Sequence, residues 1–307
     1  MTDRTVNNCL QNILVGINIG PVDDTLFPYV GALVEKAGTT SISFLHVMPK
    51  LWNIKKGWDI NHTELITQHR DFKQSLKDNI LSNILKYHID LDPNAINVAI
   101  KEGNPLEELL HYAGEVRPTT ILIGQKKEGR EHGLLGKNIL KNADQNALVV
   151  PQGTEFGIQK ILVPMDFSEY AKTALDHALK MRDMVSNPVE ITMLHVFDVP
   201  NMHKRISNTL AEYAQYLKQS IEEEFNELMQ QYASDEMKNV DYMLLQIERN
   251  SIGSNIMQFA RQQQYDMIIM GAKGHSAINR ILMGSVTERV LMNELCCPVM
   301  VIKNITT

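Results

Sequence analysis

The sequence is poor in cysteine, and its three cysteines are not spaced as metal ligands. Cys9 stands alone, whereas Cys296 and Cys297 are adjacent. There is no Cys-x2-Cys spacing and no cysteine–histidine cluster, which excludes the common zinc motifs. A disulfide between adjacent cysteines is strained and uncommon. We therefore expect a reduced chain in which Cys296 and Cys297 lead into a buried strand.

Long apolar segments are also missing. No uninterrupted apolar run approaches the roughly 20 residues that span a bilayer. Residues 1–5 lack the apolar core of a signal peptide. The formal net charge of −6 argues against nucleic acid or an anionic membrane surface as the main partner. These absences favour a cytoplasmic protein, and its 307 residues are enough for two domains.

Four short apolar blocks occur twice in the chain, in the same order and about 150 residues apart. The pairs of blocks are Asn12–Asn18 with Lys160–Asp166, Ser43–Val47 with Thr192–Val196, Ile121–Gly124 with Ile268–Gly271, and Ala147–Val150 with Pro298–Val301. Blocks of this kind are typical of strands buried on both faces of a parallel sheet. The common order indicates a duplication, with one domain in residues 1–152 and a second in 153–307.

Helical patterns lie between the apolar blocks. Helices are expected to begin after Ser168, at Asn104-Pro105 and near Asn250-Ser251. Two longer helices carry apolar stripes: Leu65, Phe72, Leu76, Ile80, Ile84 and Tyr87 in the first half, and Ile206, Leu210, Tyr213, Leu217, Ile221, Phe225, Leu228 and Tyr232 in the second. Each half is therefore predicted to be an α/β domain with a doubly wound parallel sheet of five strands. The short linker suggests that the halves pack as a pseudo-dimer.

A glycine-rich loop follows the strand that ends at Met270. It has the form G-x2-G-x9-G-S and runs from Gly271 through Gly274 to Gly284 and Ser285. Glycines at a strand end allow close approach of a ligand and a positive φ, and a helix start offers unpaired N–H groups to phosphate. The loop is neither a Walker P-loop nor a GxGxxG motif. It could bind phosphate, or its glycines could serve only as turn residues.

Other polar residues are expected at the same edge of the second sheet. Asp166 follows the first strand, where it could accept a ribose hydroxyl or cap the helix near Ser168. His275 could contact phosphate or face solvent. His46 and His195 occupy equivalent strand positions, and satisfied core histidines are the favoured interpretation of both.

The second half resembles a known family. Ile161–Ser168, Leu194–Val196, the glycine loop and Cys297–Val299 are similar to the motifs of universal stress proteins. The resemblance covers both halves, and it implies two Rossmann-like, adenine nucleotide α-hydrolase-like domains that bind ATP, with or without Mg²⁺. The residues that it assigns to the nucleotide are Pro164, Met165, Asp166, Val196, Met270, Gly271, Gly274, His275, Gly284, Ser285 and Val286. It assigns neither catalytic residues nor metal ligands.

The first half departs from this pattern. Asn18 replaces Asp166, Lys127 replaces Gly274, and neither candidate for the closing glycine, Gly133 or Gly136, is followed by Ser or Thr. If the position of Lys127 requires a positive φ, a side chain there costs about 1–2 kcal/mol. We expect weak or absent nucleotide binding in this half.

Three functions are compatible with the sequence. The leading one is a nucleotide-binding protein of stress response or signalling that is not an enzyme and acts through conformation and protein partners. A slow ATP hydrolase or nucleotidyl transferase is the second, although the loop offers only Asp166, His275 and Ser285 for catalysis. A structural scaffold that binds nothing is the third. The tandem halves could suffice as an intramolecular pseudo-dimer, or two chains could form a homodimer.

Overall fold

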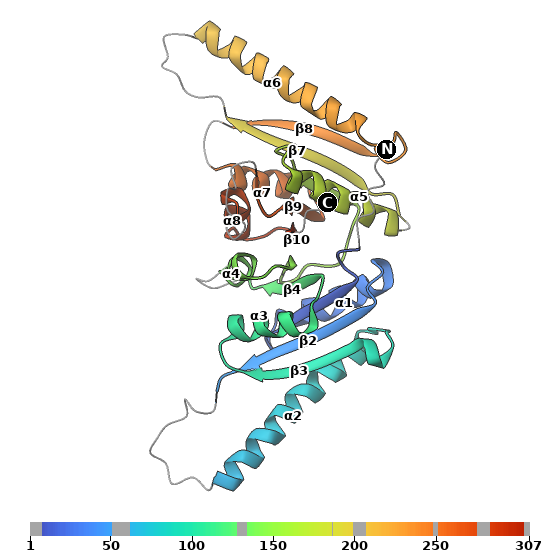
Figure 1. The fold of residues 1–307 in the computed structure, drawn as a ribbon, viewed down its shortest axis with the longest axis vertical. Coiled ribbons are helices and arrows are strands. Elements are labelled where there is room, and N and C mark those ends of the chain that lie inside the picture. The colour runs from blue at the N-terminus through green and yellow to red at the C-terminus, as the bar shows by residue number, and fades with distance from the viewer. Residues whose placement is uncertain are drawn as a thin grey trace. The chain divides into compact units, whose positions relative to one another are not determined.

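A computed structural model describes residues 8–50, 62–127, 134–185, 187–198, 207–247, 251–274 and 283–303. The described residues form two compact units. The first runs from Asn8 to Phe156, and the second begins at Gly157. His275, Gly133 and Asn250, which the sequence analysis named, lie outside the described ranges. Figure 1 shows the helices and strands of both units.

The first unit alternates strands and helices. Its elements are β1 (Asn12–Ile17), α1 (Asp23–Lys36), β2 (Ser41–Met48), α2 (His62–Lys86), a short 3-10 helix (Pro93–Ala95), β3 (Ile96–Glu102), α3 (Pro105–Val116), β4 (Thr120–Gln125), α4 (Leu134–Asn142) and β5 (Asn146–Pro151). The strands are parallel and ordered β3-β2-β1-β4-β5. The strand order therefore reverses between β1 and β4.

The second unit repeats this arrangement. Its elements are β6 (Lys160–Pro164), α5 (Glu169–Met184), β7 (Glu190–Asp198), α6 (Ser207–Gln230), β8 (Val240–Ile247), α7 (Ile252–Gln262), β9 (Met267–Gly271), α8 (Ser285–Leu291) and β10 (Val299–Ile302). Its parallel strands are ordered β10-β9-β6-β7-β8, with the reversal between β6 and β9. The predicted pair of doubly wound α/β sheets is confirmed.

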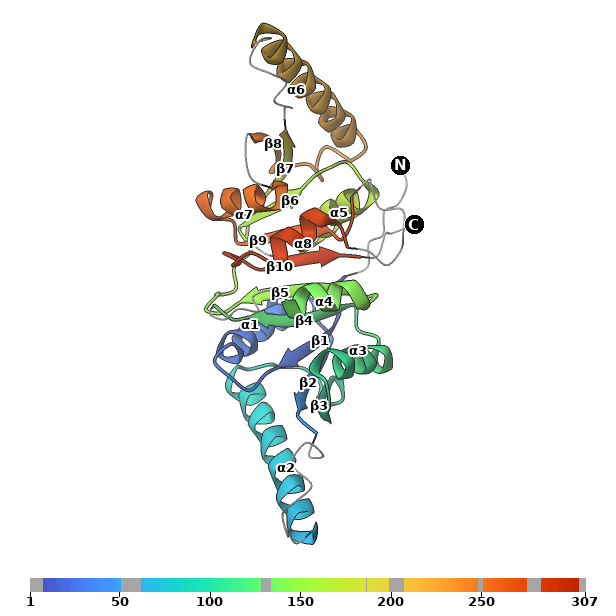
Figure 2. The same ribbon diagram turned by 90° about the vertical axis from the view of Figure 1, so that its left-hand side faces the viewer.

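Helices cover both faces of each sheet, so the central strands are buried. Ile13, Leu14 and Val15 in β1 have no exposed surface, and neither do Ile161 and Leu162 in β6. Figure 2 shows α1 and α3 on opposite faces of the first sheet, and α3 packs beside α4 as α7 packs beside α8. This two-sided burial explains why the strands appear in the sequence as continuous apolar runs.

Three predicted helix starts are confirmed by side-chain caps. Asn104 Oδ1 accepts the N–H groups of Leu106 at 3.0 Å and Glu107 at 3.3 Å. Ser168 Oγ accepts the N–H of Ala171 at the start of α5. At the start of α7, Ser251 Oγ accepts the N–H of Ser254 at 3.3 Å. Each cap satisfies N–H groups that have no partner within the helix.

The apolar stripes of the two long helices are buried only near the C-terminal ends. Ile80 and Ile84 of α2 and Phe225 of α6 are buried, whereas Phe72 and Tyr213, on the same stripes, are 53% and 46% exposed. The apolar stripes are therefore only partly covered in the structure. Helices α2 and α6 have 25 and 24 residues, so each is at least about 36 Å long. Strands β3 and β8 have 7 and 8 residues and are at most about 26 Å long. The N-terminal ends of α2 and α6 therefore extend beyond the strands (Figure 1).

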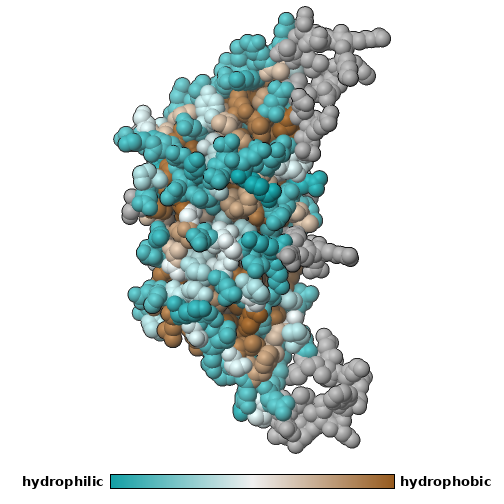
Figure 3. Space-filling model, turned by 180° about the vertical axis from the view of Figure 1, so that it is seen from behind, coloured by the Kyte–Doolittle hydropathy of each residue, from teal (hydrophilic) through white to brown (hydrophobic). Residues whose placement is uncertain are grey.

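The described surface is mostly hydrophilic on the face that Figure 3 shows, with hydrophobic patches scattered between polar residues. Among the helices that the structure describes, none is both long enough and apolar enough to cross a bilayer.

Candidate functional site

The candidate site lies where the strand order of the second unit reverses. Here β6 ends at Pro164 and β9 ends at Gly271. These two parallel strands are neighbours in the sheet, so their following loops leave from the same edge. Crevices at such reversal points are the usual ligand sites of doubly wound sheets. The loop after β6 contains Asp166, and the loop after β9 contains Gly274.

Asp166 and Gly274 lie in direct contact. A Cβ on Gly274 would collide with Oδ2 of the Asp166 carboxylate. Gly271 is equally restricted, because a Cβ there would lie 2.7 Å from the Cβ of Tyr170 in α5. Gly271, Gly274 and Gly284 do not have a positive φ. Of the two roles considered for glycine here, close approach is present at Gly271 and Gly274, and a positive φ is not.

The other oxygen of Asp166 organises the turn into α5. Ser168 donates to Oδ1 from its N–H at 3.1 Å and from its hydroxyl at 2.6 Å. Ser168 in turn caps α5. Asp166 therefore does not cap α5 itself but holds Ser168, the residue that does, while its Oδ2 lies against Gly274. One carboxylate thus links the start of α5 to the loop after β9.

Aromatic contacts hold the loop after β6 in place. Phe167 has a left-handed φ of 62°, and its ring stacks on His195 at 5.4 Å and meets Phe225 edge-on at 4.8 Å. His195 Nδ1 lies 2.8 Å from the carbonyl oxygen of Met165. Burial lowers the pKa of His195, and the Met165 carbonyl and Asp166 act in the opposite direction. His195 is a satisfied core histidine, as expected.

The first unit repeats this local geometry at the equivalent positions. His46 Nδ1 lies 2.9 Å from the carbonyl oxygen of Ile17. Ile19 has a φ of 54°, which corresponds to Phe167 in the second unit. The expected role of His46 as a core histidine is confirmed. The histidine and the left-handed residue after the strand are therefore common to both units and do not distinguish a binding unit from a non-binding one.

The chain returns from the glycine loop to the end of β9 at the start of α8. The N–H of Gly284 donates to the carbonyl of Ala272 at 2.8 Å. Thr287, which is buried, donates its hydroxyl to the carbonyl of Gly271 at 2.9 Å. A Cβ on Gly284 would also lie 3.3 Å from the Cα of Lys273. These contacts bring Gly284 and the exposed Ser285 back to the loop that holds Gly274.

The remaining predicted residues line the strand ends. Met165, Val196 and Met270 are 3%, 8% and 3% exposed, so their side chains belong mostly to the core. Pro164 is half-buried and pairs with Leu194 in the sheet. Val286 is held against α7, since a Cβ on Gly253 would lie 2.8 Å from its carbonyl oxygen. The predicted residue His275 lies outside the described residues.

Lys273 was not among the predicted site residues. It lies between Gly271 and Gly274, and only 8% of its surface is exposed. Lysine ammonium groups are frequent phosphate ligands. A lysine inside the glycine loop was the available sequence signal. Lys273 is therefore a buried cationic residue within the glycine loop.

A different carboxylate occupies the corresponding loop of the first unit. Asp23, at the start of α1, accepts the N–H of Asn18 at 3.3 Å and the N–H of Gly20 at 3.0 Å. Asp23 is only 5% exposed. Burial raises its pKa, while the bonds from the loop backbone lower it. These N–H groups of the loop are therefore already bonded to an anionic side chain of the protein itself.

The two glycine positions of the first unit also differ in their surroundings. A Cβ on Gly124 would collide with Val22, the residue that precedes α1, so this glycine serves the packing of the helix start. Lys127 does not have a positive φ, and its Nζ lies 3.2 Å from the place of a Cβ on Gly153. The strain considered for Lys127 is therefore absent. Among the described loop residues, the two units therefore differ in their side chains.

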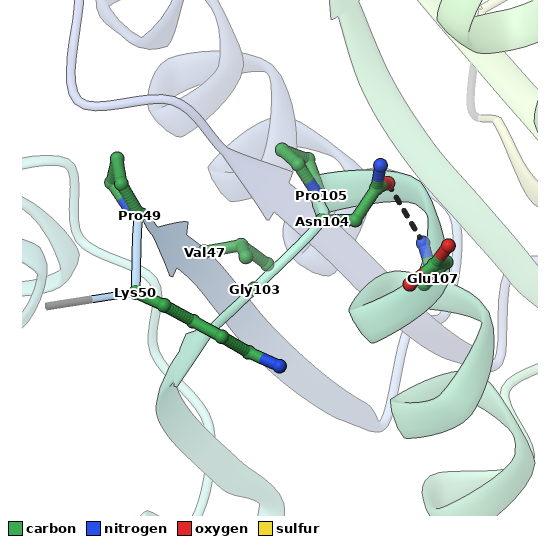
Figure 4. Close-up of a pocket in the computed structure, with 7 residues that line it drawn as sticks. All are labelled: Val47, Pro49, Lys50, Gly103, Asn104, Pro105 and Glu107. Atoms are coloured by element: carbon green, nitrogen blue, oxygen red, sulfur yellow. Dashed lines mark hydrogen bonds between the residues drawn. The ribbon is translucent and has the colours of Figure 1, made fainter. Parts of the chain in front are cut away.

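The first unit also contains a pocket of about 490 Å³. It is lined by Val47, Pro49, Lys50, Gly103, Asn104, Pro105 and Glu107. Figure 4 shows that these residues come from the ends of β2 and β3 and from the start of α3. The pocket lies beside β2 and β3, away from the reversal between β1 and β4. Because Asn104 already accepts the first N–H groups of α3, the pocket does not offer a free anion site there.

The described residues do not include a group of three or more His, Cys, Asp and Glu side chains that could hold a metal ion. His69, one of two histidines spaced seven apart on α2, lies 3.6 Å from Glu102. The side chain of His62 lies outside the described residues.

Comparison with known proteins identifies the family. The model of the universal stress protein family matches residues 157–303. Universal stress protein MJ0577 of Methanocaldococcus jannaschii is 33% identical over 156 residues, which are 47% of this chain and 94% of that protein. The chain belongs to the universal stress protein family. Universal stress protein MJ0531 of the same organism is 30% identical over 146 residues, or 47% of this chain and 82% of its own length.

The family fold extends over both units. A universal stress protein from Archaeoglobus fulgidus has a similar structure, with a TM-score of 0.60. The alignment covers 96% of this chain and 97% of that one, at 16% sequence identity. Each of the two Methanocaldococcus relatives matches about half of the present chain. The family model thus matches the second unit, and the first unit has the same fold, which is the arrangement of a tandem universal stress protein.

Proposed function

We propose that this universal stress protein binds ATP in its second unit and acts in stress response or signalling through conformation and protein partners. The contact between Asp166 and Gly274 carries this proposal. It joins a carboxylate and a glycine loop at the reversal point of the sheet, where doubly wound folds bind nucleotides. Membership of the universal stress protein family supports the same ligand class.

The residues at this edge suggest an orientation for the nucleotide. Asp166 Oδ2 would accept hydrogen bonds from ribose hydroxyls. Pro164, Met165, Val196, Met270 and Gly271 would border the adenine and ribose. Gly274, His275, Gly284, Ser285 and Val286 would surround the phosphates, and Lys273 would supply positive charge. The Asp166 carboxylate lies where a Cβ on Gly274 would stand, so the loop presents bare backbone beside this carboxylate.

The geometry favours a binding protein over an efficient hydrolase. An NTPase needs a group that positions the attacking water and ligands for Mg²⁺ beside the phosphates. Asp166 is the acid available in these loops, and it accepts two hydrogen bonds from Ser168. Its carboxylate is thus engaged in holding the turn into α5. We propose ATP binding with or without Mg²⁺ and turnover slower than about 1 s⁻¹, the low end for enzymes.

The first unit is proposed to bind nucleotide weakly or not at all. Asn18 provides no anionic acceptor, and Asp23 occupies the loop N–H groups with its own negative charge. A nucleotide would therefore find the backbone donors of the loop after β1, the counterpart of the Asp166 loop, already taken by a side chain of the protein. The pairing of the halves as a pseudo-dimer, or of two chains as a homodimer, stays a prediction.

Two measurements test the proposed function. Mass spectrometry of ligand released from the purified, denatured protein should detect an adenine nucleotide. A single-turnover assay with Mg²⁺ should then show hydrolysis slower than about 1 s⁻¹. Faster turnover would favour the hydrolase. Failure to retain nucleotide, together with no binding at millimolar ATP, would favour the structural scaffold.

A further inference from the structure

Cys296 and Cys297 lie between α8 and β10, at the edge of the second sheet where its strands begin. The candidate nucleotide site lies at the opposite edge, because all strands of this sheet are parallel. Both thiols are free. Cys297 is buried, with 3% of its surface exposed, whereas Cys296 is partly exposed. Cys296 is therefore the more accessible residue of the pair.

Helix α7 supplies the polar surroundings of Cys296. The sulfur of Cys296 lies 3.9 Å from the carbonyl oxygen of Met257 and 4.0 Å from the sulfur of Cys297. Arg261 lies one turn further along the same face of α7. Its Nη2 donates to the carbonyl of Glu294 at 3.1 Å, and the guanidinium also interacts with the Cys296 side chain. The two sulfurs are neighbours without a bond, next to a permanent positive charge.

The two thiols are expected to ionise differently. A hydrogen bond from Cys297 and the positive charge of Arg261 lower the pKa of Cys296 to about 7, although burial acts against them. The pKa of Cys297 is raised by its hydrogen bond with Cys296, by burial, and by the negative charges of Cys296 and Asp266. In the neutral pair Cys296 is the donor, to the Met257 carbonyl and to the Cys297 sulfur. Once Cys296 is ionised, Cys297 stays protonated and donates to the thiolate. The thiolate is the reactive form of cysteine, and basic neighbours mark reactive sites.

We propose that Cys296 is a reactive thiol that exchanges with small-molecule disulfides, which makes it a modification site separate from the nucleotide-binding edge. The Cys296 sulfur attacks one sulfur of the disulfide. A new sulfur–sulfur bond forms as the old one breaks, and the other half leaves as a thiolate that takes up a proton from water. The small disulfide is the oxidant, and it is reduced to a thiol as Cys296 becomes a mixed disulfide. Cys297 remains a thiol throughout.

Alkylation of the intact protein tests the reactivity. Iodoacetamide is added to samples at a series of pH values between about 5.5 and about 9, and peptide mass spectrometry measures the rate at which each cysteine is alkylated. Cys296 should be labelled at least tenfold faster than Cys297 and Cys9, and its rate should be half-maximal near pH 7. Cys9 is 6% exposed and serves as the internal control. A half-maximal rate near pH 8.5, the ordinary range of cysteine, would overturn the proposal.

Matched variants separate the chemistry from a change in folding. Cys297→Ala removes the hydrogen-bond donor, so labelling of Cys296 should become half-maximal at a higher pH. Cys297→Ser keeps a donor and should largely restore the native pH dependence. Oxidised glutathione should add one glutathione per native chain and none to Cys296→Ser. Labelling of Cys296 no faster than that of Cys9, or equal labelling of Cys296 and Cys297, would show that the pair is only a packing element. These readouts do not depend on nucleotide binding.

Discussion

Asp166 and Gly274 meet at the ends of β6 and β9, where the carboxylate Oδ2 occupies the space that a Cβ on Gly274 would need. This contact fixes the distance between two loops that are far apart in the sequence. It also explains why the first unit differs at both positions together. Asn18 and Lys127 replace the two partners there, so the first unit lacks both the charge and the bare backbone of this contact.

Gly274→Ala should destabilise the second unit and weaken ATP binding. The added Cβ would displace the Asp166 carboxylate, and overpacking of this kind costs about 1–3 kcal/mol. Unfolding in urea measures the change. Gly114→Ala in α3 is the control, because a Cβ at Gly114 would meet no atom within 4 Å. The control should stabilise its helix by about 0.5–1 kcal/mol. A Gly274→Ala protein of unchanged stability would contradict the close approach.

Thr287→Val should loosen the start of α8. It removes the buried hydrogen bond to the Gly271 carbonyl, which should cost about 1–2 kcal/mol and lower ATP affinity severalfold. Thr25→Val is the matched control, since Thr25 is also buried and accepts the N–H of Gly153 at 2.7 Å in the first unit. Both variants should lose stability in urea, but calorimetric titration should find weaker ATP binding only in Thr287→Val. Equal ATP affinities in the two variants would argue against a role for α8.

The stability of the second unit should fall in mild acid because of His177. Burial on α5 lowers the pKa of His177 to about 4, and Lys180 adds to the effect. The unfolded chain takes up this proton near pH 6.5, so between about pH 6.5 and about pH 4 the unfolded state binds more protons. Stability is therefore complete above the unfolded pKa and is lost as the pH falls toward 4, by up to about 3 kcal/mol.

His177→Gln tests this linkage. The free energy of unfolding, measured in urea near pH 7 and near pH 4.5, should depend less on pH in the variant than in the native chain. An identical dependence in both proteins would assign the acid sensitivity to other groups.

Much of the fold could be predicted from the sequence because its strands are buried on both faces. The apolar blocks beginning at Asn12 and Lys160 became the central strands, and Asn104 and Ser168 became helix caps. The extent of helix burial could not be predicted in this way. Periodicity shows which face of α2 or α6 is apolar, but only the length of the neighbouring strands decides where that face stops being covered.

The candidate site shows a similar division. Spacing predicted that Asp166 and the glycine loop share one edge, because parallel strands end together. The reason for the glycines was not predictable, since a close neighbour such as Tyr170 is set by tertiary packing. Asp23 was missed because it lies at a helix start in the first unit, outside the family motif. The nucleotide contacts themselves stay predictions.

Calorimetric titration of ATP into the native chain and into Asp166→Asn tests the central claim most directly. The account predicts one ATP per native chain. It also predicts affinity that is lower by roughly 10–100-fold in Asp166→Asn, as expected for loss of a hydrogen bond to a charged group. Asn18→Ala, the matched change in the first unit, should leave both values as they are. Two ATP molecules per chain, or unchanged affinity in Asp166→Asn, would contradict the claim that ATP binds in the second unit beside Asp166.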